Sequence, residues 1–234
     1  EFVNNTNLPR NINIEVNRNK KNVGLVENYH LVINRAKELN NDFFALVDGD
    51  DYFIDDGRLQ KHIELLNSNP DLSMSFDAIL LFNEENQTFS IDNSKQNLNK
   101  TKYDIFDLVR ENFMAACSVI RGNIVLKIPD ELFNIFTADW FIHIIISKYG
   151  DIGFIKKPMF VYRRHKQGDW SGRTPLFNSK RLFKAINDFN IITNYKYYNY
   201  NYLNLMNIYN QTYEEPFEDL DLLIIDDVFP HPSN

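Results

Sequence analysis

The sequence contains a single cysteine, Cys117, among 234 residues. One cysteine excludes an internal disulfide framework and is typical of a reducing compartment, so we expect a cytoplasmic protein, with contact at the inner face of the membrane as an open alternative that the cysteine does not decide. No apolar run reaches the roughly 18–20 residues of a membrane-spanning helix, which predicts no transmembrane span and leaves peripheral contact only. No secretory signal pattern opens the sequence.

The sequence also lacks an excess of basic residues. Lys and Arg number 25 against 32 Asp and Glu, a net charge of −7. A general nucleic-acid binder normally shows a strong basic footprint, so we expect no nucleic-acid partner. There is no repeat of the solenoid type. Hydrophobic residues at 44% and aromatic residues at 14% suffice for a substantial core.

Strand patterns alternate with helix patterns, which predicts an α/β sheet. The expected strands are residues 12–16, 43–47 and 73–82, with extended segments at 117–120 and 124–128. Residues 152–162 are expected to form either a pair of strands or one strand bent around Pro158. The expected helices cover residues 25–39, 59–68, 104–110 and 139–149, and beyond residue 175 the segments around 182–189 and 203–209. A buried-strand pattern, residues 222–225, lies near the end of the chain.

The most informative stretch is residues 46–53, Leu-Val-Asp-Gly-Asp-Asp-Tyr-Phe. An apolar run leads directly into Asp48, Asp50 and Asp51. A strand that ends in acids puts negative charge at the carboxyl edge of a sheet, where open α/β folds bind ligands. Carboxylate oxygens suit Mg²⁺ or Mn²⁺, which usually keep waters and add substrate phosphates. The alternative is an acidic turn that caps the next helix.

Two further segments carry candidate chemistry. Asp139 begins an apolar helix; it could be a helix cap, which the local sequence favours, or a general base whose pKa is raised beside Trp140. The segment at residues 162–165, Tyr-Arg-Arg-His, could neutralise a diphosphate, and His165 could bind a metal. The alternative for this segment is a solvated basic loop. Trp170 and the glycines around it suggest a loop that covers substrate.

In order and spacing these segments resemble the inverting GT-A glycosyltransferases of the family 2 type, over residues 11–170. The similar segments are an Asn-Val-Gly turn (22–24), the Asp-x-Asp-Asp segment (46–53), a helix with an Asn-Pro-Asp turn (59–71), the segment near the acceptor (113–119), the Asp of the catalytic pair (139–140), a Tyr-Arg-x-His segment (162–165) and a Gly-x-Trp-Ser loop (168–172). The resemblance implies a Rossmann-like mixed sheet flanked by helices, with a helical C-terminal extension.

The resemblance also implies a reaction and roles for named residues. A sugar would pass from a nucleotide-sugar donor, expected to be a UDP-sugar, to a hydroxyl of a growing bacterial surface polysaccharide or its lipid-linked precursor, assisted by Mn²⁺ or Mg²⁺. Ala138 stands where many members have an acid, so the role of base falls on Asp139 alone. The remaining implied sites are the donor site at Asp48, Arg163 and Arg164, the metal site at Asp50 and His165, and the acceptor side at Cys117, Trp140 and Trp170.

The two ends of the chain depart from the family pattern. Members normally open with strands that bind the nucleotide base, and such strands are missing here. Residues 210–213 and 222–227 resemble them, so a permuted domain would bring Asp226 and Asp227 to the donor site. The rival, which we slightly favour, is a fragment of a larger enzyme whose tail resembles the start of a GT-B-type domain. We divide the chain into a core, residues 1–175, and an extension with a terminal strand, residues 176–234.

Two other functions are compatible with the same pattern. A sugar nucleotidyltransferase shares the sheet and the metal carboxylates, but it would need a glycine-rich phosphate loop, which the sequence does not show. A nucleotide- or glycan-binding module with an incomplete donor site would have lost the chemistry and kept the fold.

Overall fold

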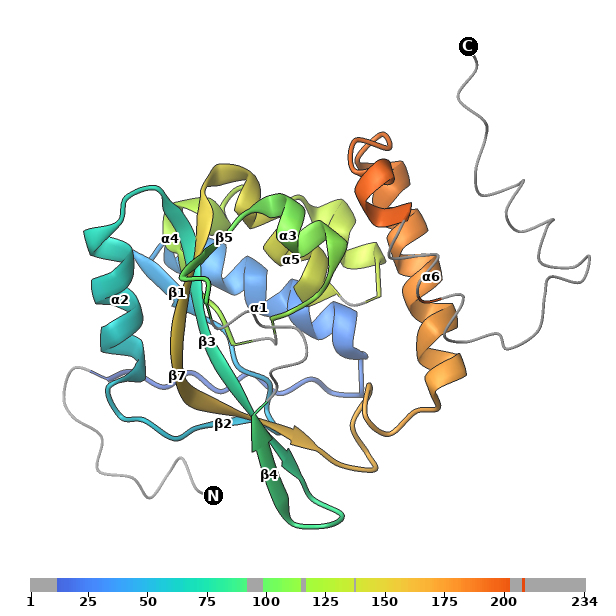
Figure 1. Ribbon diagram of the computed structural model, residues 1–234, viewed down its shortest axis with the longest axis horizontal. Helices are drawn as coiled ribbons and strands as arrows, with labels where there is room; N and C mark the ends of the chain where they lie inside the picture. Colours follow the sequence, from blue (N-terminus) through green and yellow to red (C-terminus); the bar gives the residue numbers. More distant parts are fainter. Residues whose placement is uncertain (1–11, 92–98, 115–116, 137, 203–207, 209–234) are drawn as a thin grey trace, which may run out of the picture.

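A computed structural model describes residues 12–91, 99–114, 117–136, 138–202 and 208 (Figure 1). The fold is α/β, with a mixed sheet flanked by helices. The strands are β1 (Phe43–Ala45), β2 (Tyr52–Phe53), β3 (Leu72–Asn83), β4 (Thr88–Ile91), β5 (Lys102–Tyr103), β6 (Val119–Arg121) and β7 (Asp151–Arg164). The helices are α1 (Leu25–Leu39), α2 (Arg58–Ser68), α3 (Ile105–Arg110), α4 (Gly122–Val125), η2 (Asp130–Asn134), α5 (Ala138–Ile146), η3 (Ser147–Tyr149) and α6 (Pro175–Ile192).

The sheet has the strand order β1-β6-β3-β7-β2, with β4 added to β3 and β5 added to β7. The long strands β3 and β7 run parallel at its centre, and every other pair is antiparallel. Residues of β3 alternate between the two faces of the sheet, as successive residues of a strand must. Met74 and Phe76 join the main core, while Ser75 and Asp77 bond to side chains of α2.

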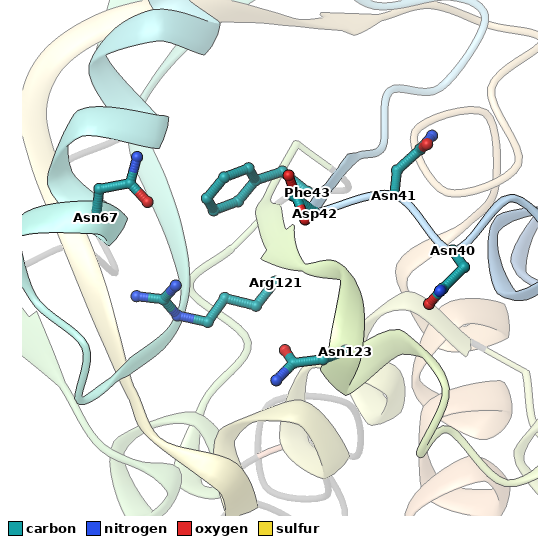
Figure 2. Close-up of a pocket in the computed structure, with 7 residues that line it drawn as sticks. All are labelled: Asn40, Asn41, Asp42, Phe43, Asn67, Arg121 and Asn123. Atoms are coloured by element: carbon teal, nitrogen blue, oxygen red, sulfur yellow. The ribbon is translucent and has the colours of Figure 1, made fainter.

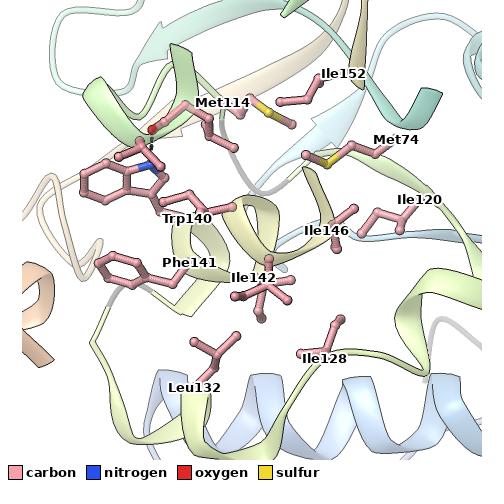
Figure 3. Close-up of a cluster of buried hydrophobic side chains, with 14 of the residues drawn as sticks. Met74, Met114, Ile120, Ile128, Leu132, Trp140, Phe141, Ile142, Ile146 and Ile152 are labelled. Carbon is pink, nitrogen blue, oxygen red and sulfur yellow. Dashed lines mark hydrogen bonds between the residues drawn. The ribbon is translucent and has the colours of Figure 1, made fainter. Parts of the chain in front are cut away.

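The main core lies between the sheet and helices α1, α3 and α5 (Figure 3). Helix α5 is apolar almost all round, which is typical of a buried helix. Trp140 is only 1% exposed, and its indole N–H donates to the carbonyl of Leu108 at 2.8 Å. This bond satisfies the one polar atom that the ring brings into the core.

Helix α2 buries a polar face against the sheet. The apolar spacing of this segment predicts a buried stripe of Leu59, Ile63 and Leu66. The residues that are buried are instead Arg58, His62 and Leu66, four positions apart, and Leu59 is 42% exposed. The Arg58 guanidinium forms an ion pair with Asp77 at 2.7 Å, and His62 Nε2 lies 3.1 Å from the same carboxylate.

Several expected elements are confirmed. Helix α1 covers residues 25–39, and α3 begins after Asp104, which forms a capping box with Asp107. The strand expected over 73–82 is β3, and the strand expected over 152–162 is the single strand β7.

Two expected elements are wrong. Residues 12–16 form no strand; Ile12, Ile14 and Val16 are 43–65% exposed on an unpaired segment. An alternating pattern makes a strand only where a partner strand pairs with it, and no described strand pairs with residues 12–16. Residues 122–125 form the short helix α4 and not an extended segment, so the extended segment expected over 124–128 was wrong. The elements expected over 203–209, apart from Ile208, and over 222–227 lie outside the described residues.

Helix α6 packs on the main core. It begins with a cap, because Thr174 Oγ1 accepts from the N–H of Phe177 and proline occupies the first turn. Its inner face adds Ala185, Ile186 and Phe189 to the same apolar cluster as the sheet. The ring of Phe189 stacks on that of Phe141 of α5, with 4.7 Å between centroids.

Candidate functional site

The acid loop, residues 46–51, joins β1 to β2, which are the outermost strands of the sheet path. Leu46 continues the pairing of β1, with its N–H donating to the carbonyl of Ser118. The chain then turns, and the N–H of Asp51 donates to the carbonyl of Asp48 at 3.1 Å. After the turn, β2 pairs with β7. The acids therefore lie between two segments that are both fixed to the sheet.

Each acid of the loop is bonded to a different element. The Tyr29 hydroxyl, from α1, donates to Asp48 Oδ1 at 2.9 Å. His165 Nε2, directly after β7, lies 2.8 Å from Asp50 Oδ2. The backbone N–H of Arg163 donates to Asp51 Oδ1 at 2.9 Å. The structure thus brings together α1, the acid loop and the end of β7.

Burial makes Asp48 and Asp51 weaker acids than usual. It raises the pKa of Asp48, although the bond from Tyr29 acts in the opposite direction and the charge of Asp50 adds to the rise. It raises the pKa of Asp51 to about 7, with the bond from Arg163 as a partial offset and the charges of Asp50 and Asp48 as further causes. Asp51 Oδ2 is buried and has no hydrogen-bond partner among the described residues. Neutral pH therefore lies within the titration of Asp51.

Asp139 belongs to the same electrostatic cluster. It is half-buried in the first turn of α5, and burial, then the negative charge of Asp48, raises its pKa to about 6. Asp139 in turn contributes, after burial, to a pKa of Tyr29 well above the usual value. Such a carboxylate is ionised at neutral pH and is still a stronger base than an exposed aspartate.

For the other residues predicted to bind the donor, the structure shows no side-chain bond to the acid loop among the described residues. Arg163 turns its guanidinium to Glu84 at 2.7 Å, so only its backbone reaches the acid loop. Arg164 is exposed at the end of β7. Asp226 and Asp227 lie outside the described residues.

Two predicted acceptor-side residues need correction. Trp140 is 1% exposed and Cys117 is 0% exposed, so neither can contact an acceptor. Trp140 is bonded within the core, and the carbonyl of Cys117 accepts from the buried guanidinium of Arg58. Trp170, by contrast, is 41% exposed on the loop after His165.

Two residues of the site neighbourhood were not singled out from the sequence. Tyr29 has the spacing of an apolar residue on the buried face of α1, and nothing local to it signals a bond to Asp48. His143 lies one turn after Asp139 on α5, with its Nε2 2.7 Å from Ser118 Oγ. Burial lowers the pKa of His143 to about 4, so this histidine is neutral and joins α5 to the segment before β6.

A divalent cation would find two adjacent donors here, the carboxylate of Asp50 and the imidazole of His165. The described part of the chain contains no group of three or more His, Cys, Asp or Glu side chains arranged for a metal. Two protein donors still fit Mg²⁺ or Mn²⁺, because these ions retain waters and take further oxygens from substrate phosphates. An imidazole beside a carboxylate suits Mn²⁺ better than Mg²⁺.

A surface depression of about 500 Å³ lies elsewhere, at the start of β1 (Figure 2). Its lining includes Asn41, Phe43, Asn67 and Arg121, and the Arg121 guanidinium is bonded to carbonyls at the end of α2 and the start of β3. It opens before the strand, and the acids follow the strand. We therefore do not include it in the site.

No protein-family model matches the sequence. Curated relatives include an uncharacterized protein of Mycobacterium bovis and uncharacterized proteins from two strains of Mycobacterium tuberculosis. Each is 28% identical over 152 residues, which is 64% of this chain and 41% of the relative. The chain thus spans about two fifths of the length of these relatives, and their printed names state no activity.

Among the helices that the structure describes, none is both long enough and apolar enough to cross a bilayer.

Proposed function

We propose that this chain is a glycosyltransferase of the GT-A type, which moves a sugar from a nucleoside diphosphate donor to an acceptor hydroxyl with inversion. The observation that carries the proposal is the Asp50–His165 contact at 2.8 Å, between residues 115 positions apart. It lies in the same electrostatic cluster as Asp139. The resemblance assigns Asp50 and His165 to metal binding and Asp139 to the base, and the charge of Asp48 acts on Asp139 while the charge of Asp50 acts on Asp48.

Asp139 is the proposed general base. Its pKa of about 6 keeps it ionised at neutral pH and basic enough to accept a proton. The acceptor oxygen would bond to the anomeric carbon as the bond from that carbon to the diphosphate oxygen breaks. The hydroxyl proton would pass to Asp139, and the electron pair of the broken bond would leave with the nucleoside diphosphate. A single displacement of this kind inverts the anomeric centre.

The groups on the acid loop would serve the donor. Asp50 and His165 would hold a divalent ion that, when bound, offsets the negative charge of the leaving diphosphate. Asp48, fixed by the Tyr29 hydroxyl, would contact the nucleotide. The exposed guanidinium of Arg164 would add positive charge at the same end of β7.

The acceptor side is proposed more coarsely. The exposed ring of Trp170 offers an apolar face on which a sugar ring can stack. By resemblance, the donor is a UDP-sugar, and the acceptor is a surface glycan or its lipid-linked precursor. That acceptor would place the protein in the cytoplasm, at the inner face of the membrane.

The test is a panel of nucleotide sugars, each assayed for hydrolysis and transfer with and without Mn²⁺. We expect Asp50→Ala to abolish metal-dependent turnover, and Asp139→Ala to remove transfer while donor binding persists. Asp56→Ala is the matched control, because Asp56 is an exposed carboxylate on the connection between β2 and α2. Normal transfer by the Asp139→Ala protein would refute the assignment of the base.

A binding module with an incomplete donor site is the second candidate. It is favoured by the absence of a three-residue metal cluster in the described residues and by the missing strand at residues 12–16. Calorimetry with UDP and Mn²⁺ separates the two candidates when it is combined with the donor panel. UDP binding without turnover of any donor would favour a nucleotide-binding module, and no UDP binding would favour a glycan-binding one.

A further inference from the structure

The loop that follows β7 is a compact unit closed by its own hydrogen bonds. We call residues 165–173 the His165 loop. The Ser171 hydroxyl donates to the carbonyl of His165 at 2.9 Å, and the N–H of Gly172 donates to the carbonyl of Gly168 at 2.9 Å. His165 and the exposed Trp170 therefore belong to one body, and a displacement of the loop would move both.

Helix α6 follows this loop in the chain and holds it from one side (Figure 1). Asn178 Nδ2 donates to the carbonyl of Trp170 at 2.9 Å. The Arg181 guanidinium donates to the Asp169 carboxylate at 2.9 Å and to the Asp169 carbonyl at 3.3 Å. Asn178 and Arg181 are three positions apart, so they lie on one face of α6.

The same guanidinium also reaches the segment that leads into α5. The Arg181 carbon Cζ lies 3.2 Å from the centre of the Phe136 ring. Phe136 packs against the main core two positions before α5 begins, and Asp139 is in the first turn of α5. Arg181 thus lies between the His165 loop and the start of the helix that carries the proposed base.

A planar guanidinium can stack on a ring and donate to a carboxylate at the same time, whereas an ammonium group provides the charge without the planar stacking. The contact is also partly shielded, because the Arg181 side chain is 23% exposed. Both arguments make arginine, and not a basic residue in general, the side chain that suits this position.

We propose that Arg181 is a positioning residue, which holds the His165 loop against the start of α5 so that His165 and Trp170 face the same substrate as Asp139. The inference rests on the proposed function for its catalytic part only. It assigns α6, which lies beyond the stretch that resembles the family, to the same working unit as the sheet.

The structural part is tested by limited trypsin digestion of the full chain. Lys166 and Arg173 are exposed trypsin sites within the loop, and Lys20, on the exposed segment before α1, is an internal standard. We expect Arg181→Ala to raise cleavage at the two loop sites roughly tenfold, with cleavage at Lys20 unchanged. Lys184→Ala is the matched control, since Lys184 lies on the same helix and pairs only with Asp188 in the described structure.

The catalytic part is tested by steady-state kinetics on the same variants. We expect Arg181→Ala to lower kcat about tenfold with a smaller change in donor KM, because a misplaced loop affects orientation more than initial binding. Arg181→Lys should recover part of the loss, and Lys184→Ala should match the wild type.

The possible outcomes separate the two parts. Unchanged cleavage at Lys166 and Arg173 in the Arg181→Ala protein would overturn the inference. Faster cleavage with an unchanged kcat would overturn the positioning role. A wild-type protein without turnover of any donor would overturn the proposed function and the catalytic part together, and the cleavage rates would still decide whether α6 holds the loop.

Discussion

The pKa of Asp139 sets a specific expectation for how the rate of the proposed sugar transfer depends on pH. A base with a pKa of about 6 is about nine tenths ionised at pH 7 and about one tenth ionised at pH 5. Because only the ionised form accepts the proton, kcat should fall roughly tenfold between pH 7 and pH 5. An exposed aspartate, with an ordinary pKa of 3.8, would give almost no decline over this range.

The charge of Asp48 provides an internal test of this assignment. It is the second cause, after burial, of the raised pKa of Asp139. Asp48→Asn should therefore shift the acidic limb of the profile to lower pH, even if loss of the proposed nucleotide contact lowers the maximum rate. The assay is kcat between pH 4.5 and 8.5 at saturating donor and Mn²⁺. Because Asp51 titrates near pH 7, the profile is also recorded for Asp51→Asn, in which the limb near pH 6 should remain. A wild-type limb centred near pH 4, or an unshifted limb in Asp48→Asn, would refute the reasoning.

Two further predictions concern stability. The pKa of Asp51 in the folded protein is about 7, above its unfolded value, so the folded state binds more protons than the unfolded state between about pH 4 and pH 7. The free energy of unfolding should therefore fall as the pH rises through this range. Urea midpoints should be lower at pH 8 than at pH 5.5, and Asp51→Asn should reduce that difference. Asp77 accepts from Arg58, His62 and the N–H of Met159, so Asp77→Ala, which leaves the Arg58 charge buried without its partner, should cost about 3–5 kcal/mol in urea unfolding. A loss below about 1 kcal/mol would contradict that account of the α2 interface.

Elements that depend on local chemistry could be predicted from the sequence. The start of helix α3 can be predicted from Asp104, because its carboxylate accepts from the N–H of Asp107, only three positions away, and this capping bond needs no distant partner. The failures occur where a distant partner decides the outcome. Leu59 is exposed because Arg58 and His62 find Asp77 on β3, 15 to 19 positions away, and no pattern within α2 reveals that partner.

In the candidate site, too, the features set by local sequence could be predicted and those set by distant partners could not. A strand that runs into acids predicts charge at an end of a strand, and the structure has Asp48, Asp50 and Asp51 directly after β1. The bonds that complete the cluster depend on the fold. Tyr29 had the spacing of a core residue, and only the approach of α1 to the acid loop makes its hydroxyl a partner of Asp48. Hydrophobic periodicity indicates that a tyrosine ring is buried, but it does not indicate whether the hydroxyl of that tyrosine bonds to a carboxylate.

The error at Trp140 has a geometric cause that also bears on the proposed role of Asp139. Successive residues of a helix point about 100° apart, so a residue and its neighbour rarely face the same surroundings. Trp140, Phe141 and Ile142 are each 1% exposed. Asp139, in the first turn of α5, is half-buried and lies within the electrostatic influence of Asp48 of the acid loop. The apolar residues that follow Asp139 anchor the helix in the core. The same packing that withdraws Trp140 from any acceptor holds the start of α5 within the influence of Asp48, and burial together with that negative charge raises the pKa of Asp139 to about 6, as the proposed base requires.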